Sequence, residues 1–236
     1  MTIPASPKVT IITGASQGIG AGLVAGFRGA GYLVVGTARS ISPGDDSGYL
    51  TVPGDITERE TARHIVEQAL DRFGRIDSLI NNAGIFIGKP FTEYRPADYD
   101  AITSVNLTGF FHITQRAIGQ MVEQGRGHVV NITTSLVDHA DSERPSALAS
   151  LTKGGLASVT RSLATEYASR GVRVNAVSLG VIKTEMQDAA SYAGMAGPLG
   201  RVGEVSDVVG GVLYLEDATF VTGEILHIDG GQTAGH

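Results

Sequence analysis

The sequence predicts an α/β fold in which a doubly wound parallel sheet carries helices on both faces, and three observations lead to this prediction. Short runs rich in Val, Ile and Leu alternate with longer amphipathic stretches, which is the order expected of parallel strands joined by helices. A glycine-rich turn follows the first run, where open sheets of this kind bind ligands. The chain has 236 residues, 42% of them hydrophobic, so we expect 1–236 to form a single domain around one core.

Each expected strand is a short, nearly continuous apolar run, which is typical of strands buried on both faces of a parallel sheet. The expected strands are Val9–Thr13, Leu33–Thr37, Leu50–Pro53, Ile76–Asn81, His128–Ile132, Arg173–Val177 and Glu224–Ile228. Apolar residues at helical spacing predict the helices between them. The expected helices are Ala21–Ala30, Thr57–Phe73, Ala101–Gln124, Ser150–Ser169 and Glu204–Leu215. We expect Thr57 and Glu60 to form a capping box, and residues 184–203 to form a surface loop or a flap over a site.

Composition argues against several classes of function. The net charge is −6 and no basic tract occurs, so we expect no nucleic-acid partner. The chain has no cysteine, which excludes disulfides, thiolate nucleophiles and cysteine-ligated zinc, and which is compatible with a cytoplasmic location. We expect no metal site. Met1–Pro7 lacks the pattern of a signal peptide, and no apolar run approaches the roughly 20 residues that cross a bilayer, so no membrane partner is expected.

The turn after the first strand carries Gly14, Gly18 and Gly20. Glycine lets the backbone approach a diphosphate, and the start of the following helix offers free N–H groups and the positive end of a dipole. The alternative is a tight turn without a ligand. The strand–turn–helix context favours a dinucleotide site, with Ser16, Gln17 and Ile19 also in contact with the cofactor.

The spacing Thr13-Gly14-(three residues)-Gly18-Ile19-Gly20 resembles that of the short-chain dehydrogenase/reductase family. Further segments of that family follow in the same order. They are Asn81-Asn82-Ala83-Gly84 after the fourth strand, Asn106 on the long helix, Lys153 on the next helix, and Thr222-Gly223 with Asp229-Gly230-Gly231 near the C-terminus. The resemblance implies a Rossmann-like fold, a homotetramer and a small-molecule substrate. It also implies cofactor contacts by Asn82, Ala83, Gly84, Ile182 and Thr184.

The end of the second strand indicates which dinucleotide binds. NAD-preferring relatives carry an acidic residue where this chain has Ala38. Arg39 can form a two-pronged contact with a 2′-phosphate, and Ser40 can add a hydroxyl. We therefore expect NADP(H) to be preferred over NAD(H), the alternative being that Arg39 covers the adenine or is solvated. Asp55-Ile56 resembles the family pair that holds the adenine, while Asp55 has a second interpretation as a helix N-cap.

The resemblance also implies four cooperating groups for catalysis. A serine or threonine steadies the substrate oxygen, a tyrosine transfers its proton, a lysine lowers the pKa of that tyrosine and holds the nicotinamide ribose, and an asparagine holds a water. Asn106 and Lys153 match this set. The hydroxyl position falls at Thr134, with Ser135 one residue further, and capping of the strand end is an equal alternative for each.

The tyrosine position holds Ala149, one helical turn before Lys153 and on the same face. A shifted motif does not replace it, because no tyrosine in the chain (32, 49, 94, 99, 167, 192 and 214) is followed by lysine four residues later. A second departure is Leu179, which precedes Gly180 where relatives usually carry proline. We expect Leu179 to loosen that turn without preventing cofactor binding.

Three explanations of Ala149 stay open. Another group supplies the proton, with candidates at His139, Asp138, Asp141, Glu143 and Tyr192. Alternatively, the reaction needs little acid, as in reduction of a conjugated alkene or an iminium, or Ala149 is an inactivating change. The sequence favours an NADP(H)-dependent oxidoreductase that moves a hydride to or from a small carbonyl, alkene or imine at an atypical site. The alternative is a dinucleotide-binding protein with little or no catalysis, such as a sensor, a pseudoenzyme or an engineered inactive variant.

Overall fold

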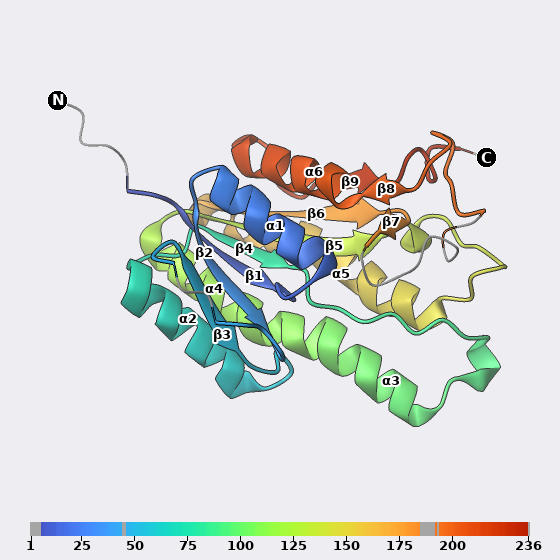
Figure 1. Ribbon diagram of the computed structural model, residues 1–236, viewed down its shortest axis with the longest axis horizontal. Helices are drawn as coiled ribbons and strands as arrows, with labels where there is room; N and C mark the ends of the chain where they lie inside the picture. Colours follow the sequence, from blue (N-terminus) through green and yellow to red (C-terminus); the bar gives the residue numbers. More distant parts are fainter. Residues whose placement is uncertain (1–5, 44–45, 185–191, 193, 236) are drawn as a thin grey trace.

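The seven-stranded parallel sheet predicted from the alternation of elements is present, with helices on both faces (Figure 1). The structure is a computed structural model that describes residues 6–43, 46–184, 192 and 194–235. The strands follow the order β3-β2-β1-β4-β5-β6-β9. They are β1 (Val9–Thr13), β2 (Leu33–Ala38), β3 (Tyr49–Pro53), β4 (Ser78–Asn81), β5 (Gly127–Thr134), β6 (Val172–Leu179) and β9 (Ile225–Ile228).

Helices form one layer on each face of the sheet. The helix α1 (Gly18–Gly29) packs beside α6 (Val205–Asp217) on one face, and α2 (Arg59–Phe73), α4 (Phe110–Gln124) and α5 (Ala147–Tyr167) cover the other (Figure 1). Strand β1 contributes side chains to the cores on both faces of the sheet, because successive side chains point to opposite faces. Ile12 belongs to the core under α1 and α6, whereas Ile11 belongs to the core under α2, α4 and α5.

The long helix predicted over Ala101–Gln124 begins earlier and contains an irregular turn. The helix α3 (Pro96–Thr103) starts at a proline in its first turn, passes through a π-helical segment, Ser104–Gly109, and continues as α4. A π segment inserts an extra residue into a helix and is frequent at functional sites. The prediction missed α3 because this short helix buries only Asp98 and Ile102, which leaves little apolar periodicity to detect.

The capping box predicted at Thr57 and Glu60 is wrong. The helix α2 begins at Arg59, and its N-cap residue Glu58 forms no side-chain capping bond. Asp55 decides this start, because its Oδ1 accepts the backbone N–H of Thr57 at 3.0 Å. That bond holds Thr57 in a turn that precedes the helix.

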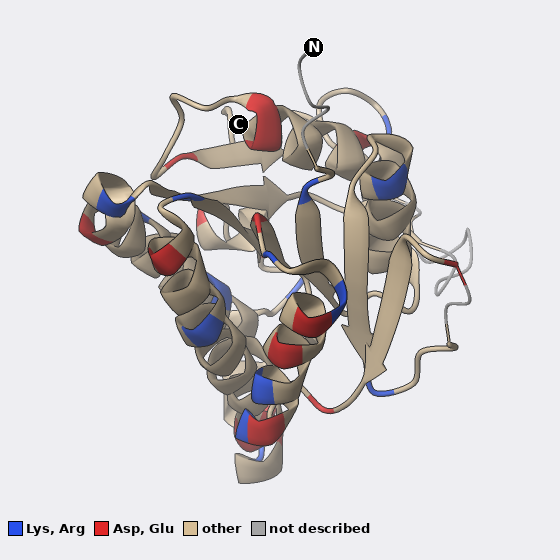
Figure 2. Cartoon of the chain, turned by 90° about the vertical axis from the view of Figure 1, so that its left-hand side faces the viewer, with Lys and Arg blue, Asp and Glu red and all other residues tan. Residues whose placement is uncertain are grey.

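The expected loop over 184–203 is framed by two short strands, β7 (Ile182–Lys183) and β8 (Gly203–Glu204), which pair in parallel. Residues 185–191 and 193 of this loop lie outside the described residues, so the expected flap is not tested. Lys and Arg are interspersed with Asp and Glu on the helices seen in Figure 2. Within the described ranges, no helix has both the length and the apolar content to cross a membrane.

The sheet also determines where a ligand can bind. Strands β1 and β4 are neighbours at the middle of the sheet. Strands β2 and β3 follow on the β1 side, and β5 and β6 follow on the β4 side. The connections on either side of β1 and β4 therefore diverge, which leaves a crevice at the carboxyl ends of these strands. The glycine turn and the Asn81–Gly84 segment both follow strands at this edge.

Candidate active site

A cleft of about 590 Å³ lies at the carboxyl edge of β1, β2 and β4. It brings together all the predicted cofactor residues except Lys153 and Ile182. The predicted residues that line it are Gly14, Ser16, Gln17, Gly18, Ile19, Gly20, Arg39, Ser40, Asp55, Ile56, Asn82, Ala83, Gly84 and Thr184. Residues that sequence analysis did not assign to the site also line it, namely Thr37, Gly54, Ile85 and Val105 together with Ala38.

The glycine turn is shaped by close backbone approach. Gly14 has a φ of +67°, a conformation that side chains disfavour. A Cβ on Gly20 would lie only 1.9 Å from the carbonyl oxygen of Gly14, so only glycine fits there. No side chain caps the first turn of α1. The first N–H groups of that helix are therefore available to an anionic ligand.

The hydroxyl of Thr13, which directly precedes the glycine turn, is hydrogen-bonded to the segment after β4. Thr13 is 2% exposed, and its Oγ1 accepts the backbone N–H of Asn82 at 3.0 Å and of Ala83 at 2.9 Å. In return, Nδ2 of Asn82 donates to the carbonyl oxygens of Thr13 and Gly14 at 2.9 and 3.2 Å. Sequence analysis gave Thr13 no such role, because its partners lie about seventy residues away and only the sheet brings them together.

The end of the cleft beside β2 carries a cation that has no partner among the described residues. Arg39 and Ser40 are exposed at the end of β2, and the Arg39 guanidinium forms no hydrogen bond or ion pair with the part of the chain that the structure describes. Asp55 stands nearby with one carboxylate oxygen engaged by Thr57. Asp55 lines the cleft and holds the turn before α2. Its interpretation as the helix N-cap is wrong, because the N-cap of α2 is Glu58.

Thr184 is held at the edge of the cleft by Tyr192. The hydroxyl of Tyr192 accepts the backbone N–H of Thr184 at 2.9 Å and donates to its carbonyl oxygen at 3.3 Å. The Thr184 side chain in turn lies near Gly18, where an added Cβ would be 3.5 Å from its methyl group. Ile182 does not line the cleft, because it packs on the core under α1 and α6.

Lys153 projects from α5 to the edge of the cleft. Its Nζ donates to the carbonyl oxygen of Ile132 on β5 at 2.7 Å, and an added Cβ on Gly84 would lie 3.0 Å from that Nζ. Because Gly84 lines the cleft, the ammonium borders it. Burial penalises the charged ammonium and lowers the pKa of Lys153 to about 8.

Asn106 lies in the π segment and is 1% exposed. Its Oδ1 accepts the backbone N–H of Ile85 at 2.9 Å, while its Nδ2 donates to the carbonyl of Ile85 and to Oγ1 of Thr152, both at 3.1 Å. The same Oδ1 would lie 3.2 Å from a Cβ on Gly84. The side chain of Asn106 therefore ties the segment after β4 to α5, close to Lys153.

The two hydroxyls after β5 differ in their partners. Oγ1 of Thr134 accepts the backbone N–H of Leu136 at 3.4 Å, whereas the buried Ser135 donates to Oε1 of Gln232 at 3.1 Å. The same Gln232 oxygen would lie 3.0 Å from a Cβ on Gly180. Sequence analysis missed Gln232, which comes from the C-terminal segment and carries no motif signal. Leu179 is buried at the end of β6 in register with Ile228, and the expected loosening of the turn before Gly180 stays a prediction.

Ala149 lies in the first turns of α5, four residues before Lys153. It is 3% exposed. With Leu148 and Ile102 it forms a small apolar cluster, and Ile85 and Tyr94 pack against this cluster. The methyl group of Ala149 thus packs among apolar side chains, one turn before Lys153 on α5.

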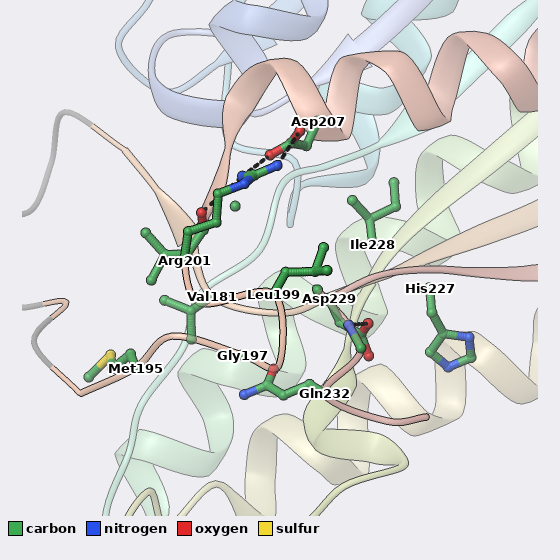
Figure 3. A pocket seen from close by; sticks show the side chains of 14 residues that line it. Val181, Met195, Gly197, Leu199, Arg201, Asp207, His227, Ile228, Asp229 and Gln232 are labelled. Carbon is green, nitrogen blue, oxygen red and sulfur yellow. Dashed lines mark hydrogen bonds and ion pairs between the residues drawn. The ribbon is translucent and has the colours of Figure 1, made fainter. Parts of the chain in front are cut away.

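Figure 3 shows a second hollow, of about 320 Å³, beside β9 and the start of α6. Its wall includes Met195 and Leu199, and it shares no lining residue with the larger cleft. Its charged groups already have partners, and the Asp229 carboxylate accepts hydrogen bonds from Gly231 and Thr233. Arg201 donates to both carboxylate oxygens of Asp207 at 2.7 and 3.1 Å, and His227 lies 3.2 Å from Asp138. Gln232 connects this hollow to Ser135. Among the described residues, no group of three His, Cys, Asp or Glu could hold a metal ion.

Comparison with known proteins agrees with this geometry. Residues 14–233 match the family model described as enoyl-(acyl carrier protein) reductase. The 3-oxoacyl-(acyl-carrier-protein) reductase FabG of Thermotoga maritima is 34% identical over 245 residues, covering 95% of this chain and 97% of that protein. The chain belongs to the short-chain dehydrogenase/reductase family. The motifs that suggested this family therefore identified it correctly.

Two solved structures show which ligands similar folds hold. A tyrosine-to-phenylalanine variant of ElxO with NADPH bound has a TM-score of 0.88 and 29% identity, covering 97% of this chain and all of that chain (100%). The 3-ketoacyl-(acyl-carrier-protein) reductase from Brucella melitensis complexed with NADH has a TM-score of 0.84 and 30% identity, covering 96% of this chain and 98% of that chain. Short-chain reductases with this fold thus hold phosphorylated and unphosphorylated nicotinamide dinucleotides.

Proposed function

We propose that this chain is an NADP(H)-dependent oxidoreductase that transfers a hydride between nicotinamide and a small carbonyl, alkene or imine substrate. The observation that carries the proposal is the cleft, whose wall gathers nearly all the residues expected to contact the dinucleotide. The cradle also suits the group chemically, because close packing at Gly20 leaves no room for a side chain and the helix start has uncapped N–H groups.

Different residues of the cleft would bind different parts of the dinucleotide. The turn from Gly14 to Gly20 and Thr184 would hold the diphosphate, Arg39 and Ser40 would bind the 2′-phosphate, and Asp55 with Ile56 would hold the adenine. Lys153 would bind the nicotinamide ribose. The unpaired guanidinium of Arg39 supports the preference for the phosphorylated form, because a planar fork of donors matches a phosphate. When bound, the reduced dinucleotide supplies a hydride.

The catalytic set is atypical in this proposal. Ala149 stands at the position where the family carries its tyrosine acid, and it has no proton to give. Asn106 and Lys153 keep their places, and Thr134 or Ser135 would steady the substrate oxygen. The partly exposed Thr134 fits this role better, because Ser135 is 4% exposed and already donates to Gln232.

A second candidate function is a dinucleotide-binding protein with little or no catalysis. Ala149 favours it, since loss of a positioned general acid lowers a rate by about 100- to 10,000-fold. ElxO with a tyrosine replaced by phenylalanine still has NADPH bound, so loss of that phenol does not prevent dinucleotide binding in that protein.

Two measurements test these candidates in sequence. Calorimetry with NADPH and NADH measures binding, and we expect NADPH to bind more tightly. Absence of NADPH binding would refute both functions. NADPH oxidation is then followed with a panel of ketones, enones and imines. Steady turnover with any of them supports the oxidoreductase, whereas binding without turnover across the panel supports the non-catalytic protein.

We also propose that the chain is a single cytoplasmic domain that assembles as a homotetramer. Phe111 on α4 and Leu151 on α5 are exposed at 55% and 57%, and Phe220, beyond α6, is fully exposed. Large apolar side chains at the surface support contacts between copies. Light scattering after gel filtration should give four times the mass of 24.5 kDa, and Phe111→Glu should reduce it. A monomeric wild-type protein would refute the assembly.

A further inference from the structure

The site lacks a tyrosine acid at Ala149, so the source of a proton for the substrate has to be sought among the other protic groups. Most hydroxyls around Ala149 are already hydrogen-bond donors to protein oxygens. Ser150 donates to the carbonyl of Leu136 at 3.0 Å, Thr152 to that of Leu148 at 2.9 Å, and Tyr94 to that of Ile87 at 2.7 Å. Each proton is therefore held away from the cleft.

The two hydroxyls nearest the end of β5 are poor acids as well. Ser135 donates to Gln232 and is buried, and an aliphatic hydroxyl such as that of Thr134 gives up its proton only to a strong base. Tyr192 uses its hydroxyl to bind both backbone groups of Thr184. These residues can orient a substrate, but none of them is a free proton donor.

The acidic residues after β5 are also unsuitable. The hydrogen bond from Arg144, together with the backbone N–H of Glu143, holds the pKa of Asp141 below its usual range, so this carboxylate carries no proton near neutral pH. Asp138 lies 3.2 Å from His227, and Glu143 is exposed. His139, whose side chain interacts with Asp141, is the remaining alternative as the proton donor.

Lys153 has the properties that the other groups lack. Its ammonium has three N–H donors, and the hydrogen bond to Ile132 uses one of them. The Nζ borders the cleft beside Gly84, and no carboxylate among the described residues pairs with it. Burial lowers its pKa to about 8, which brings it near the range in which a general acid works well. Ala149, one turn before it on the same face, contributes only a methyl group, which packs against Ile102 and Leu148 and offers no proton.

We propose that the Lys153 ammonium is itself the general acid of this protein and protonates the substrate oxygen that a tyrosine would otherwise serve. The proposal rests on the oxidoreductase function proposed above. In reduction of a ketone, a hydride from the reduced nicotinamide forms the new C–H bond as the C=O π bond breaks. The proton of the new O–H comes from Nζ, which is left as a neutral amine and regains a proton from water.

A pair of substrates separates proton donation from the other roles of Lys153. A ketone needs a hydride and a proton, whereas a permanently charged N-alkyl iminium cation needs the hydride alone. Lys153→Arg keeps a positive charge and N–H donors, but a guanidinium does not release a proton near neutral pH. We expect this variant to reduce the ketone about 100- to 10,000-fold more slowly than wild type. We expect reduction of the iminium to fall less than about tenfold, because no general acid takes part.

Binding and titration supply readouts other than turnover. Calorimetry should show NADPH bound by wild type, Lys153→Arg and the control Lys8→Arg, which lies at the opposite edge of the sheet. After ¹³C reductive methylation, the Lys153 resonance, identified by its absence in Lys153→Arg, should titrate at a lower pH than the surface lysines. The wild-type ketone rate should fall with rising pH at that same midpoint, and the rate of Lys8→Arg should match wild type.

Several results would overturn the proposal. One is an equal loss of ketone and iminium reduction in Lys153→Arg. Another is a pH midpoint for the ketone rate that differs from the titration of Lys153. Loss of ketone reduction in His139→Gln, with Lys153→Arg unimpaired, would assign the proton to His139. Wild-type protein that binds NADPH but reduces neither compound would refute the oxidoreductase function, and the acid role with it.

Discussion

At the scale of single residues, the proposed site combines a cleft lined by most of the predicted cofactor residues with a small side chain at Ala149. Ala149 is enclosed by Ile85, Tyr94 and Leu148, so a larger residue has to displace apolar neighbours. Arg39 is in the opposite situation, since its exposed side chain can change without disturbing the core. These two positions give separable tests of chemistry and of cofactor choice.

We predict that Ala149→Tyr raises the rate of ketone reduction, because it places a phenol one turn from Lys153. The added ring should also destabilise the fold by about 1–3 kcal/mol through overpacking. NADPH consumption and urea unfolding measure the two effects. Ala149→Phe is the matched control, because it adds the same ring without the hydroxyl. An equal rate in both variants would mean that the pocket does not use a proton donor at this position.

Cofactor preference is predicted to depend on Arg39. Arg39→Asp should lower the ratio of NADPH to NADH affinity by about 10- to 100-fold, since a charge-assisted hydrogen bond contributes about 1.5–3 kcal/mol. Calorimetry with both dinucleotides gives the ratio. Arg39→Gln separates loss of the guanidinium from the added repulsion and should give an intermediate ratio. An unchanged ratio in both variants would remove Arg39 from the phosphate site.

At the scale of elements, the site depends on contacts between segments that are distant in sequence. The hydroxyl of Thr13 at the end of β1 holds the backbone that follows β4. Asn106 in the π segment then joins that same backbone to α5, which carries Lys153. The glycine turn, the segment after β4 and the lysine helix are thereby fixed relative to one another.

Thr13→Val is predicted to weaken this junction. Valine fills the same volume but leaves the N–H of Ala83 without the Thr13 acceptor, which should cost about 1–3 kcal/mol of stability. We also expect weaker NADPH binding, because the glycine turn loses its attachment. Urea unfolding and calorimetry provide the measurements. Thr13→Ser keeps the hydroxyl and should stay close to wild type, and a stable, tight-binding Thr13→Val would show that the backbone is held by other contacts.

At the scale of the whole molecule, a buried polar group joins the sheet to α6 at the edge opposite the cleft. His128 on β5 is 2% exposed and lies 2.7 Å from Glu216 on α6. Nδ2 of Asn175 donates to its Nε2, so the proton of the neutral ring is on Nδ1 and is shared with Glu216. The Asn175 amide is itself oriented by Val221 and Glu224. Burial lowers the pKa of His128, although the interaction with Glu216 opposes that shift.

This arrangement predicts that stability falls as the pH drops below about 6.5, the ordinary value for histidine. Below that pH, the unfolded chain binds a proton that the folded His128 resists, so protonation favours unfolding. The free energy of unfolding can fall by about 1.4 kcal/mol per pH unit. This dependence ends once the pH lies below the lowered pKa of His128 in the folded protein. Denaturant unfolding at pH 5 to 7.5 measures it. His128→Gln should flatten the slope, whereas replacement of the exposed His64 by Gln should leave it unchanged. A slope that persists in His128→Gln would assign it to other groups.

The strand and helix pattern was predictable because burial on both faces of a parallel sheet leaves apolar runs. All seven strands of the main sheet were expected from these runs, whereas the two-residue strands β7 and β8 were not. The glycine turn was predictable for a similar local reason. Errors occurred where a local polar bond or a weak apolar pattern decided the outcome. The start of α2 depends on the bond from Thr57 to Asp55, and α3 buries too little apolar surface to leave a periodic signal.

The sequence by itself determined the doubly wound sheet, the glycine turn after β1 and the absence of a tyrosine one turn before Lys153. Each depends on residue type at a fixed local spacing. The tertiary structure alone decided which polar groups are already engaged and which stay available. The hydroxyl of Ser135 is hydrogen-bonded to Gln232 from the far end of the chain. The side chain of Asn106 is hydrogen-bonded to Ile85 and Thr152. The reason is physical: hydrogen-bond partners are set by distance in space, and spacing along the chain does not encode that distance.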